Sequence, residues 1–311
     1  MYNHKRNISM KRILFSAFLL LVAFIGIQAQ LLWKISGNGL SKPSYIIGTY
    51  HLAPASFADS IPGLKNALDA SEQVYGEIIM SEMTAPENMA KLQSAMMLPD
   101  GQTIDKIFTA EEMARINAMM KDIIGIDMTN PIVAQQFGKM SPQALTTQLT
   151  VLIYLKKNPK FNPNQTFDEY FQNKAKEQGK PVGALETIDF QMELLYKGQT
   201  EERQKELLLC LADNKDMYEM ITENITKAFF TQDLKAINDA MEEKLNNSCD
   251  YTPQEKDALI YNRNADWIKK MPEIMKKRAT FFAVGAGHLT GEQGVLELLK
   301  KAGYKVESVR Q

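Results

Sequence analysis

The sequence predicts a mixed α/β (α+β) fold with one central mixed β-sheet built from both ends of the chain. Short apolar runs bounded by turn residues occur before residue 81 and again after residue 278. Between about residues 85 and 260 the composition changes to Met, Leu, Ala, Lys and Glu, which favours helices. We therefore expect strands from the two ends of the chain and a large helical insertion between them.

The N-terminal half of the predicted sheet has three strands. Residues 31–36 and 40–48 predict two strands joined by a turn, because Asn38-Gly39 is a hairpin-type dipeptide. A helix is expected over residues 61–70. Residues 72–80 then read as a third short apolar strand that contains Glu77.

The insertion contains several helices whose ends can be placed from capping residues. Ser141 and Pro142 predict the start of a helix over 141–157, and Gly179 predicts the end of a helix over 167–179. Residues 180–186 predict a short strand that ends at Glu186, before a helix capped by Thr187. Further amphipathic helices are expected over 216–230 and 233–245, followed by a capping box at 252–255 that opens a helix through residue 267.

The C-terminal segment reads as strand, helix, strand. Residues 279–288 are mostly apolar and predict a buried strand, residues 291–303 a helix, and residues 304–309 a final strand. A β-α-β unit of this kind predicts that its two strands pair in parallel.

The first 29 residues predict a signal peptide. Four basic residues precede an apolar stretch that ends in small residues, and we place the cleavage site after Ala29. An uncleaved membrane anchor is the alternative, although the apolar run is slightly short of the ~20 residues needed to span a bilayer. Residues 30–311 are expected to form a single exported domain, periplasmic or extracellular. The formal net charge of −1 argues against a nucleic-acid partner, which would need a basic face.

Cys210 and Cys249 are the only two cysteines. In an oxidising compartment they could form a disulfide, and two separate buried thiols are the alternative. Sequence alone leaves both interpretations open, because it gives no distance between them.

The candidate site begins with a repeated Gly-x-x-His frame. Gly48 precedes His51 and Gly285 precedes His288, each at the end of a predicted strand, and these are the only histidines after residue 29. The glycines are expected to let the backbone turn sharply and approach a ligand. If the two strands are neighbours, the imidazoles converge at the ligand-binding edge of the sheet.

Three charged residues complete the candidate site. Glu77 lies in a buried run, where a carboxylate needs a partner, and it could instead pair with a core Arg or Lys. Glu186 could instead accept backbone N–H groups at the following helix. Arg263 shares a helical face with Leu259 and Trp267, so it either reaches the site or extends to solvent.

Two histidines with one or two carboxylates suit a divalent metal, which can lower the pKa of a bound water to about 7. The segment 285–291 also resembles a glycine-rich dinucleotide loop, but its GxGxxxG spacing is a weak match.

These motifs resemble the TraB/GumN family, whose animal relatives include the Tiki metalloproteases. The resemblance rests on residues 31–53 through 75–77 and on 281–306, with support from 166–187 and 261–271. It implies a fold like those of erythromycin esterase and the ChaN-like proteins, and a metal-dependent hydrolase with His51, His288 and Glu77 at its core. It also implies that Glu186 and the pair Arg263-Asn264 belong to the site. Asn262 departs from the family pattern, which often has Glu there.

The resulting hypothesis is a hydrolase, most readily a peptidase, that uses manganese, cobalt or zinc. His51, His288 and Glu77 would hold the metal, Glu186 would be a general base or a fourth ligand, and Arg263 would stabilise the oxyanion. Its partner would be a peptide or small-molecule substrate, with a membrane contacted only through an uncleaved signal peptide. Two alternatives are a protein that sequesters a peptide signal without turnover and a metal-free hydrolase with His51 as general base.

Overall fold

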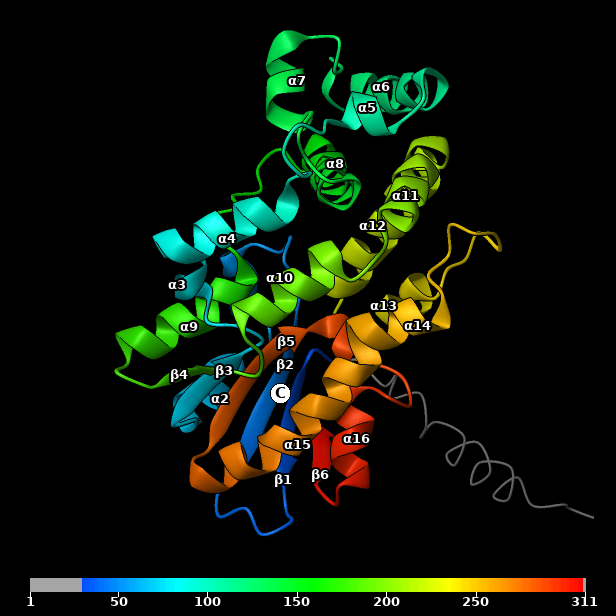
Figure 1. Cartoon of the computed structure of the whole chain (residues 1–311). Helices are drawn as coiled ribbons and strands as arrows, with labels where there is room; N and C mark the ends of the chain where they lie inside the picture. Colours follow the sequence, from blue (N-terminus) through cyan, green and yellow to red (C-terminus); the bar gives the residue numbers. More distant parts are fainter. Residues whose placement is uncertain (1–29, 310–311) are drawn as a thin grey trace, which may run out of the picture.

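A six-stranded mixed sheet in the order β4-β3-β5-β2-β1-β6 forms the centre of the fold (Figure 1). The structure is a computed structural model that describes residues 30–309, so the predicted signal peptide lies outside the described residues. Strands β4, β3, β5 and β2 run parallel to one another, whereas β1 is antiparallel to both β2 and β6. The predicted mixed sheet is confirmed. Its strands are β1 (Leu32–Ser36), β2 (Ser44–Thr49), β3 (Gln73–Gly76), β4 (Val182–Ala184), β5 (Thr280–Gly285) and β6 (Lys305–Ser308).

The predicted β1–β2 hairpin is also confirmed. Leu32 lies opposite Ile47 in antiparallel register. Between the strands, Gly37, Asn38 and Gly39 all have positive φ angles, which Gly and Asn adopt more easily than other residues.

The predicted parallel pairing of the last two strands is wrong. Strand β5 lies between β3 and β2, and β6 pairs antiparallel with β1 at the sheet edge. The burial of the two strands explains these positions. All of residues 280–284 are buried, as suits a strand covered on both faces, whereas β6 alternates between exposed and buried residues, as suits an edge.

Strands β3 and β4 are shorter than predicted. Strand β3 ends at Gly76, so Glu77 follows the strand instead of lying inside it, and β4 ends two residues before Glu186. Where the chain leaves the sheet, the Ile78 carbonyl accepts a hydrogen bond from the buried Gln172 side chain, at 2.8 Å. A Cβ at Gly76 would lie only 2.5 Å from the same amide, so glycine is required at this exit.

Apart from β4, the described chain between β3 and β5 contains helices and their connections, as predicted. The caps of α8 and α14 form as expected, with the Ser141 hydroxyl accepting from the Ala144 N–H and with the complete capping box at Thr252 and Glu255. The helices of this region are α3 (Met80–Met83), α4 (Pro86–Met96), α5 (Ile104–Ile107), α6 (Ala110–Ile124), α7 (Pro131–Phe137), α8 (Pro142–Lys157), α9 (Phe167–Glu177), α10 (Ile188–Lys197), α11 (Glu201–Asp213), α12 (Lys215–Phe230), α13 (Leu234–Met241), α14 (Pro253–Lys256), the π-helical turn η2 (Asp257–Tyr261) and α15 (Asn262–Lys277).

Four shorter elements accompany the strands: η1 (Ala55–Ser60), α2 (Leu64–Ala70), η3 (Ala286–His288) and α16 (Val295–Lys301). Helix α9 packs against β3, β4 and β5, where Phe171 stacks on Phe281 with 5.2 Å between ring centroids. Helices α15 and α16 lie along the sheet (Figure 1). The main hydrophobic core is therefore built on the sheet.

A second hydrophobic core lies among the helices. Helices α5, α6, α7, α8 and α11 bury a cluster of their own, and Figure 1 shows them at the end of the molecule away from the sheet. Fully buried members include Ile116, Met120, Leu145, Leu149 and Leu208. No helix within residues 30–309 has the length and apolar character needed to cross a membrane.

Cys210 of α11 forms a disulfide with Cys249, which precedes α14. Of the two open interpretations, the disulfide is therefore the one confirmed. The bridge ties the loop before α14 to the helical core.

We expect loss of this bridge to destabilise the protein. In the chain-entropy account, closing a loop of 39 residues contributes about 4 kcal/mol to the free energy of unfolding. The Cys210→Ser/Cys249→Ser variant should therefore unfold at a lower urea concentration than the oxidised protein. Dithiothreitol should destabilise the wild type and leave this variant unchanged. Equal midpoints for variant and wild type would contradict the prediction.

Candidate functional site

The candidate site lies at the carboxyl ends of the parallel strands. His51 follows β2, Glu77 follows β3, Glu186 follows β4, and His288 ends the 3-10 turn η3 after β5. Arg263 comes from α15. Because parallel strands end at the same edge of a sheet, residues more than 200 positions apart in sequence are brought to one place.

The two glycines of the Gly-x-x-His frames provide space, not the sharp turn that we predicted. Neither residue adopts the left-handed backbone region. A Cβ at Gly48 would lie 3.0 Å from Ala286, because β2 and the turn after β5 pack closely. A Cβ at Gly285 would lie 3.2 Å from the Glu77 carboxylate. Larger residues would therefore push these two segments apart.

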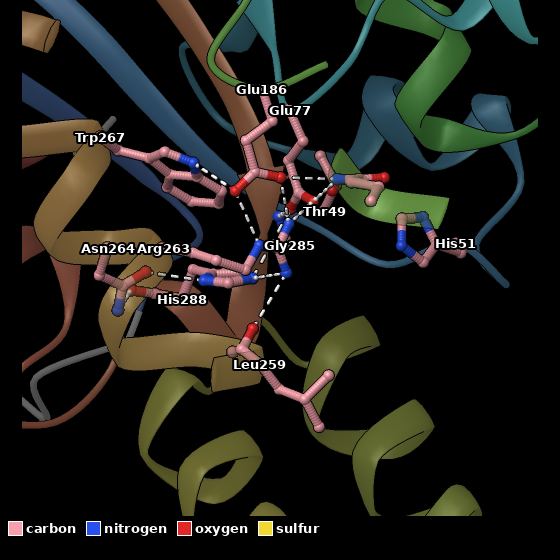
Figure 2. Close-up of polar contacts among 12 residues, drawn as sticks. Thr49, His51, Glu77, Glu186, Leu259, Arg263, Asn264, Trp267, Gly285 and His288 are labelled. Carbon is pink, nitrogen blue, oxygen red and sulfur yellow. Dashed lines mark hydrogen bonds and ion pairs between the residues drawn. The ribbon is translucent and has the colours of Figure 1, made fainter. Parts of the chain in front are cut away.

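Arg263 lies at the centre of the site, and each of its five N–H donors has an acceptor (Figure 2). Its Nε and Nη2 donate to the two oxygens of Glu186, at 2.8 and 2.9 Å. Nη2 also donates to Glu77 Oε2 at 2.7 Å. Nη1 donates to the Leu259 carbonyl and to His288 Nε2, both at 3.0 Å. The residue is only 7% exposed, so Arg263 lies in the site and does not extend to solvent.

The elements around Arg263 hold it in place. Its guanidinium carbon lies 5.2 Å from the Trp267 ring, one helical turn away on α15. The Leu259 carbonyl belongs to the π-helical turn η2, an irregularity that often occurs at functional sites. Arg263 and Trp267 therefore face the site together, as predicted, whereas Leu259 contributes only its backbone carbonyl and its side chain points away (Figure 2).

The acceptor positions of Glu186 are all occupied. Besides the two bonds from Arg263, Oε1 accepts from Trp267 Nε1 at 2.8 Å and Oε2 accepts from Gln191 Nε2 at 2.9 Å. Its side chain is only 3% exposed. A carboxylate with four donors around it has no free lone pair for a proton. This geometry suits holding Arg263 in position better than acting as a general base.

Glu77 is a buried but ionised carboxylate. Its Oε1 accepts from the Gly285 backbone N–H at 2.7 Å, and its Oε2 accepts from Arg263 and from Gln191. Burial alone would raise the pKa of Glu77, but the neighbouring His288, Arg263 and His51 outweigh it and lower this pKa to about 2. Glu77 therefore does pair with a buried arginine, as the alternative interpretation expected, and that arginine is Arg263 of the site.

His288 is held as one defined neutral tautomer. The buried Asn264 side chain donates from Nδ2 to the backbone carbonyls of His288 and Gln293, so its Oδ1 faces His288 Nδ1 at 2.7 Å as an acceptor. Nδ1 therefore carries the proton, and Nε2 presents a lone pair. Burial lowers the pKa of His288 to about 4, against the attraction of Glu77.

His51 is oriented by a carboxylate that the sequence reading did not assign to the site. Asp168, in the first turn of α9, lies 3.0 Å from His51 Nδ1 and also accepts from the Thr49 hydroxyl at 2.5 Å. The attraction and hydrogen bond of Asp168 raise the pKa of His51 to about 9, although the imidazole is 75% exposed and water screens part of this effect. Its Nε2 is directed away from the bond to Asp168.

The two imidazoles do not meet directly. Figure 2 shows His51 set apart from the cluster of Glu77, Glu186, Arg263 and His288. Within residues 30–309, no three His, Cys, Asp or Glu side chains are gathered as a metal-binding group. The donor chemistry nevertheless fits a divalent metal, because an oxygen holds Nδ1 of each imidazole and leaves Nε2 as the ligand.

One distance is slightly too long for a metal as it stands. His288 Nε2 lies 4.0 Å from Glu77 Oε1, whereas two ligands of a tetrahedral ion with bonds of about 2.0–2.2 Å lie roughly 3.3–3.6 Å apart, so these two side chains would have to approach each other to share an ion.

Sequence reasoning missed Asp168 and Gln191. Both lie near the start of a helix that follows a Thr cap, Thr166 for α9 and Thr187 for α10. An acidic residue in a first helical turn normally interacts with the helix dipole, so this position alone gives no reason to expect a site residue. Only the fold, which brings the first turn of α9 to the end of β2, reveals the partner of Asp168.

Replacing Arg263 by an uncharged residue should destabilise the metal-free protein. Arg263→Met would leave Glu77 and Glu186 buried without their cation, which typically costs about 3–5 kcal/mol. Adding Glu77→Gln and Glu186→Gln should recover part of that loss. Urea unfolding monitored by circular dichroism measures both. An Arg263→Met variant as stable as wild type would show that the ion pairs contribute nothing.

Removing the carboxylate partner should lower the pKa of His51 in the metal-free protein. In Asp168→Asn we expect this pKa to fall by at least about 1, towards the ordinary value of about 6.5. The wild-type pair should stabilise the fold fully below pH 6.5 and lose this contribution as the pH rises through 9. NMR titration of the His51 ring tests the change, with Asp189→Asn on α10 as control. An unchanged pKa in Asp168→Asn would contradict the assignment.

Comparison with known proteins places this site in a family. The family model described as TraB/PrgY/gumN matches residues 31–308. Metalloprotease TIKI2 of Danio rerio is 22% identical over 315 residues, which cover 89% of this chain and 60% of that protein. Metalloprotease TIKI1 of Danio rerio and of Homo sapiens are each 24% identical and are covered over 62% and 61% of their length. The chain thus spans about three-fifths of these relatives. No solved structure shows significant similarity.

The match extends over the whole described sheet and over every residue of the candidate site. The chain therefore belongs to the TraB/PrgY/gumN family.

Proposed function

We propose that this protein is an exported hydrolase that cleaves peptides with the help of a divalent metal at the edge of the parallel strands. The printed name metalloprotease belongs to its relatives. In this chain, the observation that carries the proposal is that an oxygen contacts Nδ1 of both imidazoles, so that Nε2 is the nitrogen of each ring that could bind a metal. Asp168 holds one and Asn264 holds the other, each through Nδ1.

His51, His288 and Glu77 would hold the metal, which would be manganese, cobalt or zinc. When bound, such an ion lowers the pKa of a water and polarises the carbonyl that is attacked. The protein's own contribution is orientation. The Gly285 N–H fixes Glu77 Oε1, and Asn264 fixes the His288 ring. Partners of this kind typically change metal affinity or activity by about 10–100-fold when they are removed.

The roles of Glu186 and Arg263 differ from those first expected. With its four acceptor positions occupied, Glu186 positions Arg263 and Trp267 instead of taking a proton. The guanidinium has no free donor for an oxyanion in this arrangement. We therefore assign the pair to the support of Glu77 and His288.

Export is part of the proposal. It is supported by the sequence of residues 1–29 and by the Cys210–Cys249 disulfide, since disulfides persist mainly in oxidising compartments. A peptide or another small molecule is the proposed partner. The near-neutral formal charge of the chain does not favour a nucleic acid.

A second candidate is metal-free hydrolysis with His51 as general base. The observation that favours it is the contact of the exposed imidazole with Asp168, because a carboxylate on Nδ1 makes the ring more basic, so that Nε2 can accept a proton from water once the pH exceeds the raised pKa of about 9. Glu77 and His288 would then bind and orient the substrate.

Metal content separates these candidates. We expect the purified mature protein, after reconstitution with manganese, cobalt or zinc, to retain about one ion per chain. His51→Ala/His288→Ala and Glu77→Gln should lose it, because each removes a proposed ligand. Elemental analysis after gel filtration measures the ion. Glu273→Gln, an exposed carboxylate on α15, is the matched control for Glu77→Gln and should retain it.

Peptide cleavage then tests the reaction. A peptide library analysed by mass spectrometry should show cleavage by the loaded protein, and a chelator should reduce it at least about a hundredfold. Cleavage that survives chelation but not His51→Ala would support the metal-free candidate. Peptide binding without cleavage, retained after loss of either histidine, would instead indicate sequestration.

A further inference from the structure

Arg263 and a divalent metal would compete for the same atom. We infer that Arg263 acts as the resident cation of the metal-free site and gives up its hydrogen bond to His288 Nε2 when a metal binds, which frees one N–H donor for a substrate carbonyl oxygen. This inference rests on the proposed metal-dependent function and deepens it.

The competition follows from the tautomer of His288. Asn264 fixes the proton on Nδ1, so the ring has one lone pair, on Nε2. In the described structure that lone pair accepts from Arg263 Nη1 at 3.0 Å. One lone pair cannot serve an arginine donor and a metal at the same time. The metal-loaded site therefore requires a different Arg263 contact.

Charge gives an independent reason. The carboxylates of Glu77 and Glu186 are 14% and 3% exposed and both contact the guanidinium, which already neutralises one of their two negative charges. A divalent ion next to His288 would be repelled by this buried cation at close range, where the surroundings screen charge less than water does. Removing the guanidinium charge should therefore strengthen metal binding.

Only one of the five bonds has to change. The Nε and Nη2 groups remain clamped on Glu186, and Nη1 keeps its second bond, to the Leu259 carbonyl of the π-helical turn. The Trp267 ring continues to contact the guanidinium. The bond to His288 is thus the one that can be lost while the side chain stays in place.

The exchange would convert Arg263 from a structural cation into a group that contacts substrate. As described, all five donors are occupied, so none can stabilise an oxyanion. Loss of the His288 contact would leave one Nη1–H without an acceptor, next to the site of the proposed metal. A buried, unpaired charged donor is costly until a substrate oxygen accepts from it.

The direction of a change in metal affinity tests the inference. We would titrate the metal-free mature protein with Co²⁺ alone and follow its visible absorption in wild type, Arg263→Met and Arg203→Met. Arg203 is the matched control, because it is another part-buried arginine with several partners, among them Glu255 and the Asp250 carbonyl, outside the site. We expect Arg263→Met to bind Co²⁺ at least about tenfold more tightly than wild type, and Arg203→Met to bind like wild type.

Each result has a distinct meaning. Equal or weaker binding by Arg263→Met would overturn the competition and leave the proposed metal site intact. Absence of Co²⁺ binding in both wild type and Arg263→Met would overturn the competition and the proposed metal site.

If Arg263→Met does not fold, side-chain NMR of the wild type replaces the titration of this variant. On addition of Zn²⁺, the Arg263 Nη resonances should shift while those of Arg203 stay constant, and unchanged Arg263 resonances in zinc-loaded protein would overturn the inference.

Discussion

The structure of this site depends on the need to bury two carboxylates beside each other at the end of a parallel sheet. Glu77 and Glu186 follow neighbouring strands, and removing both from water would be prohibitive without a cation between them. Arg263 supplies that cation with a planar array of donors that a lysine could not reproduce. The position of α15, the π-helical turn before it and the Trp267 indole are all arranged so that this guanidinium reaches both carboxylates.

The sheet topology explains why distant segments share this site. Strands β2, β5, β3 and β4 are consecutive in the sheet although they come from positions 44 to 285 of the chain. Helices inserted between β3 and β5 pack among themselves in the separate core of α5–α8 and α11. The positions of the strand ends therefore do not depend on that core. The strand ends position both histidines and both glutamates of the site. The insertion contributes Asp168, Gln191 and Arg263, each from near the start of a helix.

Local signals in the sequence predicted much of this arrangement. Asn38-Gly39 predicted the hairpin, and the helix caps predicted α8 and α14. The two Gly-x-x-His frames marked the ends of two strands, which are neighbours in the structure, although the two imidazoles do not meet directly. The edge position of β6 could not be predicted, because the sequence does not show which strand β6 pairs with after α16. Nor could the bond between Asp168 and His51, since it forms across α9 and β2. The four hydrogen bonds that the Glu186 carboxylate accepts come from Trp267, Gln191 and Arg263 together, and no spacing rule in the sequence connects these residues.

We propose that two histidines from adjacent parallel strands bind one metal ion together with Glu77, and that Arg263 stabilises the same site when no metal is bound. X-ray absorption spectroscopy of the cobalt-loaded protein tests this most directly, because imidazole rings give a multiple-scattering pattern that carboxylates and water do not. The account predicts two imidazole nitrogens on the metal at about 2.0–2.1 Å in wild type and one in His51→Ala. A spectrum without imidazole scattering would contradict it.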